Sequence, residues 1–135
     1  MRYLGVDYGS KKVGLALSDE AGRMGFPHGI VPTGELKDVF MRLRDEKKID
    51  VVVVGESKDF AGDDNPIARE ARVFAGWVRE QGILVYFEPE MLTSAEARRQ
   101  YESAEKTRAQ KPTTPVDASA AALILTSYLA KHDHA

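Results

Sequence analysis

Residues 2–18 read RYLGVDYGSKKVGLALS, and this stretch decides how the chain begins to fold. It contains two strand-like apolar runs, at residues 2–7 and 12–18. The segment between them is of hairpin length and contains Gly9, so we expect the two strands to be antiparallel neighbours. A third strand is expected at residues 25–32 (GFPHGIVP), which completes a three-stranded meander.

The rest of the chain alternates helical and strand patterns. Residues 35–48 have the apolar spacing of an amphipathic helix, and residues 49–54 (IDVVVV) are typical of a central strand that is buried on both faces. Further elements are expected as a helix from Pro66 to Gly82, a strand over 83–87, a helix after Thr93 and a helix from Asp117 to Ala130. The pattern predicts an α/β fold with one mixed five-stranded sheet and helices on both faces.

Composition narrows the class of protein. The 135 residues fit one domain spanning 1–135. The absence of cysteine excludes disulfides, thiolate zinc sites and a cysteine nucleophile. We find neither a signal-peptide pattern nor an apolar stretch near the ~20 residues of a membrane span, so a cytoplasmic protein without membrane contact is expected.

Charge is unevenly distributed along the chain. The net charge is −2, but residues 98–111 (RRQYESAEKTRAQK) carry five basic and two acidic side chains. This segment could neutralise the phosphates of a nucleic acid even on a mildly acidic protein. An ordinary solvated helix face explains the same pattern equally well.

Acidic residues recur where parallel strands are expected to end. Asp7 ends the first strand, Glu56 follows the fourth, Glu88 and Glu90 follow the fifth, and Asp117 opens the last helix. The carboxyl ends of parallel strands share one sheet edge, where ligands collect. Carboxylates that converge there repel one another unless cations neutralise them, and Mg²⁺ prefers such hard oxygen ligands. Each residue taken alone reads more simply as a turn or cap residue.

The segment DYGSKKVGLA, residues 7–16, carries a second signal. Gly9 permits a tight turn whose backbone amides are open to an anion, and Lys11 and Lys12 could meet phosphates there. Tyr8 has two readings, a half-buried aromatic at a strand end or a platform on which a nucleotide stacks.

With one residue added before it, this segment resembles the opening of a known family. VDYGSKKVGLA at 6–16 is similar to the start of the YqgF/RuvX family, RuvC-like members of the RNase H-like superfamily. The resemblance continues through VVVVG at 51–55, ExLTSxEARR at 90–99 and VDASAAALILTSYL at 116–129. It implies an RNase H-like fold and a nuclease that uses Mg²⁺ or Mn²⁺. The implied substrate is pre-16S rRNA, processed at its 5′ end in ribosome biogenesis, with a Holliday junction as the alternative.

The resemblance also assigns site residues by position. The catalytic aspartate of the first strand falls on Asp7, the glutamate of the DER motif on Glu90, and the aspartate of the last helix on Asp117. These three are expected to hold the metal, and Glu56 could be a fourth ligand, as in RuvC-type resolvases. Nucleic-acid contacts are expected at Lys11, Lys12, Arg98, Arg99, Lys106, Arg108 and Lys111.

This chain departs from the family pattern at two places. Pro89 and Met91 replace the aspartate and arginine of the DER triplet, which removes one potential phosphate contact. The loop that usually reads VGLPxxxDG is VGESKDFAG here, at residues 54–62. A non-catalytic nucleic-acid-binding module of ribosome assembly therefore stays open as an alternative, whether as a monomer or a homodimer. A phosphotransferase related to actin-like ATPases is a third alternative. It would need a second phosphate-binding hairpin and a second domain, and the 135 residues contain neither, so this alternative is disfavoured.

Overall fold

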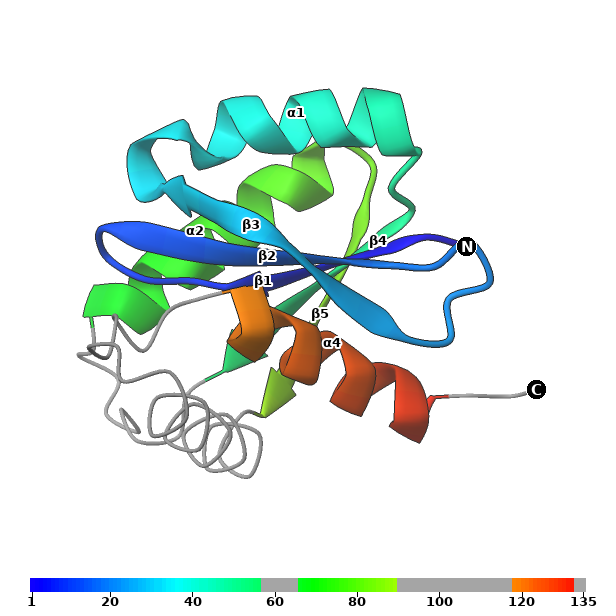
Figure 1. Cartoon of the computed structure of the whole chain (residues 1–135). Coiled ribbons are helices and arrows are strands. Elements are labelled where there is room, and N and C mark those ends of the chain that lie inside the picture. Colours follow the sequence, from blue (N-terminus) through cyan, green and yellow to red (C-terminus); the bar gives the residue numbers. More distant parts are fainter. Residues whose placement is uncertain (57–65, 90–117, 133–135) are drawn as a thin grey trace.

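The computed structural model describes residues 1–56, 66–89 and 118–132. Within them the strands form one mixed sheet in the order β3-β2-β1-β4-β5, as Figure 1 shows. β1, β2 and β3 are an antiparallel meander, and β1, β4 and β5 are parallel. The strand bounds are β1 Tyr3–Asp7, β2 Lys12–Ser18, β3 Gly25–Pro32, β4 Val51–Glu56 and β5 Leu84–Pro89. The predicted mixed sheet is confirmed.

Helices cover both faces of this sheet (Figure 1). A short 3₁₀ turn, η1 (Thr33–Glu35), leads into α1 (Leu36–Lys47), which shares one face with α2 (Pro66–Glu80). The opposite face is covered by α4 (Ala118–Lys131). None of the helices in the described part of the chain is long and apolar enough to cross a membrane.

The sequence of β4 explains why it occupies the middle of the molecule. Val52 and Val54 pack into the apolar layer beneath α1 and α2, whereas Val53 packs against α4. A strand buried on both faces needs apolar side chains at every position, and a run of valines satisfies this. On the α1 and α2 side, Phe40, Phe74 and Trp77 form an aromatic cluster with ring centroids 5.6–6.3 Å apart. Phe74 and Trp77 are therefore packing residues of this layer.

The alanine-rich helix α4 packs closely on the sheet because glycines face it. A Cβ atom built on Gly5 of β1 would lie 2.9 Å from the carbonyl oxygen of Ala121 and from the Cβ atom of Leu125. A Cβ atom on Gly25 of β3 would lie 2.9 Å from that same Leu125 atom. The Gly25 amide also donates to Thr126 Oγ1 at 3.1 Å, which ties the edge strand to the helix.

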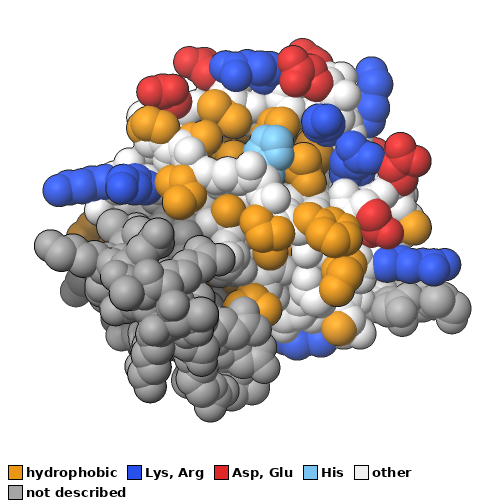
Figure 2. Space-filling model, in the orientation of Figure 1, with side chains coloured by type: hydrophobic (Ala, Val, Ile, Leu, Met, Phe, Trp, Pro, Cys, Tyr) orange, Lys and Arg blue, Asp and Glu red, His pale blue; other side chains and the backbone are white. Residues whose placement is uncertain are grey.

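The outer edge strand β3 carries exposed apolar side chains. Phe26 and Ile30 are about half exposed, and Met24 just before the strand is similar. Figure 2 shows hydrophobic side chains gathered on the face of the molecule that presents β3. This surface lies at the edge of the sheet opposite to β5, because β3 and β5 are the two outer strands.

The structure corrects two strand boundaries. β4 extends to Glu56 and β5 to Pro89, so Glu56 and Glu88 lie within strands and not in the loops after them. The reason is that the parallel ladder continues, with Gly55 paired to Glu88 and Glu56 to Pro89. The helix expected after Thr93 lies outside the described residues.

Candidate active site

Asp7 is the best-defined residue of the predicted metal site. It is the last residue of β1, it is paired with Gly14 of β2, and only 7% of it is exposed. On the other side of β1, Val6 is paired with Val54 of the parallel strand β4, which ends at Glu56. The carboxyl ends of β1, β4 and β5 therefore share one edge of the sheet, which we call the carboxyl edge.

The side chain of Asp7 lies on the face of the sheet that α4 covers. Side chains alternate along a strand, so Tyr3, Gly5 and Asp7 share a face. The ring of Tyr3 lies 6.1 Å from that of Tyr128, and Gly5 contacts Ala121.

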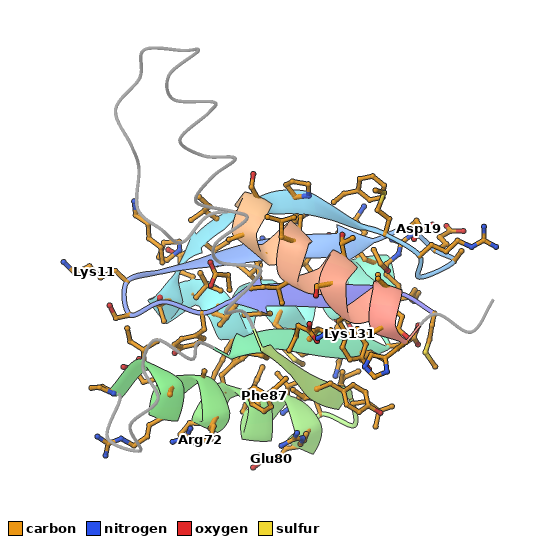
Figure 3. The ribbon with its side chains drawn as sticks, turned by 90° about the horizontal axis from the view of Figure 1, so that it is seen from below. Lys11, Asp19, Arg72, Glu80, Phe87 and Lys131 are labelled. Atoms are coloured by element: carbon orange, nitrogen blue, oxygen red, sulfur yellow. The ribbon has the colours of Figure 1, made fainter. Side chains whose placement is uncertain are left out.

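Residues later in β1 thus contact residues earlier in α4, so the helix runs antiparallel to the strand. Figure 3 shows α4 crossing this face of the sheet. The N-terminal end of α4 therefore lies at the same end of β1 as Asp7. The first described residue of that helix is Ala118, which follows Asp117 in the sequence.

The other predicted ligands are only partly within the described residues. Glu90, Asp117 and the basic segment 98–111 lie outside them, and for Glu56 only the backbone position in β4 is described. Among the side chains that the structure does describe, no group of three or more His, Cys, Asp or Glu is placed to hold a metal. The metal ligand set therefore stays a prediction, with Asp7 as its one described side chain.

Glu88 has a different role from the one expected of an open carboxylate. It is 2% exposed and accepts hydrogen bonds from Lys131 Nζ at 2.6 Å and from Ser127 Oγ at 2.9 Å. These contacts join the end of β5 to α4. Alternation along β5 puts Glu88 on the same face as Tyr86, which stacks on Tyr128 with ring centroids 5.7 Å apart.

The turn between β1 and β2 presents cations at the carboxyl edge. Thr33 fixes this turn, because its hydroxyl donates to the Gly9 carbonyl at 2.8 Å and its amide donates to the Lys11 carbonyl at 2.9 Å. Lys11 and Lys12 are exposed, and Figure 3 shows Lys11 extending from the tip of the turn. Contact of the two lysines with phosphates stays a prediction, and their exposure is compatible with it.

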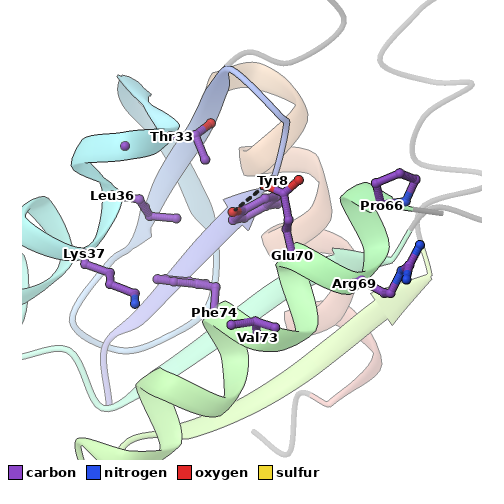
Figure 4. A pocket seen from close by; sticks show the side chains of 10 residues that line it. Tyr8, Thr33, Leu36, Lys37, Pro66, Arg69, Glu70, Val73 and Phe74 are labelled. Carbon is purple, nitrogen blue, oxygen red and sulfur yellow. Dashed lines mark hydrogen bonds between the residues drawn. The ribbon is translucent and has the colours of Figure 1, made fainter. Parts of the chain in front are cut away.

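A groove of about 610 Å³ lies at the same edge, on the face that α1 and α2 cover (Figure 4). It is lined by Tyr8, Thr33, Gly34, Leu36, Lys37, Pro66, Arg69, Glu70, Val73 and Phe74. Tyr8 is half-buried, as expected, and its hydroxyl donates to Glu70 Oε1 at 3.5 Å. Burial raises the pKa of Tyr8, and the negative charge of Glu70 raises it further. Sequence reasoning did not find this groove, because its walls come from three separate segments.

Related sequences identify the family of this chain. The sequence model of the family described as "RuvX: Holliday junction resolvase" matches residues 1–131. A protein of Geobacillus kaustophilus is 37% identical, with 96% of this chain and 97% of the relative covered. Another, of Nitratidesulfovibrio vulgaris, is 34% identical, with coverages of 96% and 94%. Both relatives carry the name "Putative pre-16S rRNA nuclease".

Solved structures show the same fold. The structure described as Thermus thermophilus RuvC in complex with a Holliday junction substrate matches with a TM-score of 0.60 and 22% identity. The match covers 99% of this chain and 97% of that one. A second structure of Thermus thermophilus RuvC matches with a TM-score of 0.59 and 17% identity, with coverages of 98% and 96%. The predicted RNase H-like fold is confirmed. The chain belongs to the RuvX family.

Proposed function

We propose that the protein is a metal-dependent endonuclease that hydrolyses phosphodiester bonds in the 5′-end processing of pre-16S rRNA. Family membership supports the nuclease class, and the names of the relatives support the rRNA substrate. The observation that carries the proposal is the position of Asp7. Asp7 is buried and is the last residue of β1. It lies at the edge of the sheet where the N-terminal end of α4 is packed.

Asp7, Glu90 and Asp117 would hold the metal in this proposal, with Glu56 as a fourth ligand. Carboxylate oxygens suit Mg²⁺ and Mn²⁺, and carboxylates that converge at one site would need a cation to offset their repulsion. When bound, such ions lower the pKa of a water and stabilise the leaving oxygen of a phosphodiester. The protein itself supplies the carboxylates, and its basic side chains bind the nucleic-acid backbone on either side of the cleaved bond.

Two groups of cations would contact the phosphates on either side of the cleaved bond. Lys11 and Lys12 are exposed on the turn that follows Asp7. The basic segment 98–111 carries a net charge of +3 in sequence and supplies the remaining predicted contacts. Phosphate contacts of this kind position a nucleic acid without reading its sequence.

A four-way DNA junction is the second candidate substrate. The description of the family and the fold shared with RuvC favour it. Both substrates present the same phosphodiester to the same carboxylates, so only cleavage can separate them.

The test is a cleavage assay that compares a structured rRNA precursor, an unstructured RNA and a four-way DNA junction. Each is incubated with Mn²⁺, with EDTA and with the variant Asp7→Asn. Asp45→Asn is the matched control, because Asp45 is an exposed residue of α1 whose carboxylate pairs with its neighbour Arg44. We expect cleavage by the wild type and the control in Mn²⁺, and none by Asp7→Asn. Undiminished cleavage in EDTA or by Asp7→Asn would overturn the proposal, and a wild type that binds one of these substrates without cleaving it would indicate a binding module.

A further inference from the structure

The floor of the groove beside Tyr8 is apolar. Phe74 and Leu36 form it, and both belong to the core layer beneath α1 and α2, with only 3% and 2% of each residue exposed. Val73 of α2 lines one side and is 69% exposed. The ring of Tyr8 lies above this floor, with its centroid 6.1 Å from that of Phe74 (Figure 4). The apolar surface that a flat ligand would meet therefore includes the half-buried ring of Tyr8 and the side chain of Val73.

The rim of the groove is polar and carries charges of both signs. Lys37 and Arg69 are the cations of the lining, and Glu70 is its carboxylate. The ammonium group of Lys37 lies 5.2 Å from the ring centroid of Trp77, which holds it above the aromatic cluster. Such a rim offers hydrogen-bond donors and acceptors to the edge of a base and positive charge to a phosphate.

The groove lies at the same edge of the sheet as the proposed site of hydrolysis. Tyr8 directly follows Asp7, but Tyr8 packs toward α1 and α2 whereas Asp7 faces α4. The two side chains therefore lie on opposite faces of the sheet at the same edge. Thr33, which lines the groove, also binds the turn that carries Lys11. A nucleic-acid strand that crosses the carboxyl edge with one phosphate at Asp7 would carry its neighbouring nucleotide over Tyr8.

We infer that this groove binds the base of a nucleotide adjacent to the cleaved phosphate, in a segment where the strand is unpaired. A paired base is stacked within its duplex and cannot enter a side pocket without being extruded, so an unpaired one is favoured. Stacking on aromatic side chains tolerates every base, because each has a π-face. This inference rests on the proposed function, since it needs a strand at the carboxyl edge.

The test measures binding of a single-stranded RNA in Ca²⁺, with an abasic site placed in turn at each position around the cleavage point. In the wild type, the abasic site at one position next to the cleaved phosphate should weaken binding by about fivefold or more, the effect of losing one stacked base. The variant Val73→Glu places a charge in the groove at an exposed position, so the fold should tolerate it. It should bind the intact RNA as weakly as the wild type binds the abasic RNA, and the abasic site should then cost it less than about twofold.

A matched pair of arginine variants controls for charge. Arg69→Ala should weaken binding of the intact RNA, whereas Arg72→Ala should not, because Arg72 is exposed on the same helix outside the groove lining. If the wild type cleaves RNA but all abasic positions are equivalent and Val73→Glu binds normally, the groove assignment is wrong and the nuclease proposal survives. If the wild type neither binds nor cleaves any nucleic acid, the proposed function fails and the groove assignment fails with it.

Discussion

Replacing Gly5 by alanine tests the close packing that brings α4 to the Asp7 end of β1. The added Cβ atom would lie 2.9 Å from the carbonyl oxygen of Ala121 and 2.9 Å from the Cβ atom of Leu125. Neither atom can rotate away, because one is backbone and the other is fixed to it. The helix must therefore move outward from β1, or the strand must move inward.

The expected cost follows from these contacts. Overpacking of a well-packed interior by a methylene group costs about 1–3 kcal/mol. The reduced freedom of alanine in the unfolded chain offsets about 0.4–1 kcal/mol of this. We expect the free energy of unfolding to fall by roughly 1–2 kcal/mol for Gly5→Ala.

Urea denaturation measures this change. With a slope of about 2 kcal/mol per molar urea, the midpoint should fall by about 0.5–1 M. Gly29→Ala is the matched control, because Gly29 lies in β3 and nothing is within 4 Å of its added Cβ atom. Cleavage by Gly5→Ala should also fall well below that of the control when both are fully folded, since the start of α4 is displaced from Asp7. Equal midpoints for the two variants would refute the packing argument.

Three further perturbations test other parts of the structure. Lys131→Met leaves the buried carboxylate of Glu88 without its cation, although the side chain of Lys131 is itself 53% exposed; we expect a loss of about 1–3 kcal/mol in urea unfolding, largely restored by adding Glu88→Gln. The pKa of Tyr128 is raised, chiefly by burial, so above pH 10 the unfolded chain ionises this group before the folded chain does. The stability of the wild type should therefore fall as pH rises through that range. In thermal melts between pH 9 and 11, the stability of Tyr128→Phe should fall less steeply. Affinity for RNA should depend less on salt concentration when alanine replaces Lys106, Arg108 and Lys111, and an unchanged salt slope would remove these residues from the interface.

Local signals in the sequence were sufficient to predict much of the fold. The hairpin around Gly9 and the valine run of β4 were predicted because each depends on neighbouring residues alone. The end of β5 was not, because its extension to Pro89 depends on pairing with β4 and not on its own residues. For the same reason the partner of Glu88 could not be read from the sequence, since Lys131 lies 43 positions away.

The same distinction holds for the candidate site. The positions of Asp7 at the end of β1 and of Lys11 and Lys12 in the turn after it could be predicted, because they depend only on the local hairpin. The groove beside Tyr8 could not, since it exists only when η1, α1 and α2 are packed beside the end of β1. The sequence does indicate Tyr8 as a residue that could stack on a nucleotide, but no pattern in it indicates the floor of the groove.

In the proposed enzyme, acidic residues far apart in the sequence form one cation site. Mn²⁺ binding, followed by the loss of the free-ion electron paramagnetic resonance signal, tests it without requiring any substrate. We expect the wild type and Asp45→Asn to bind Mn²⁺ equally, and Asp7→Asn, Glu90→Gln and Asp117→Asn each to weaken that same binding by about tenfold or more. Binding that is unchanged in Asp7→Asn, or absent from the wild type, would contradict the account.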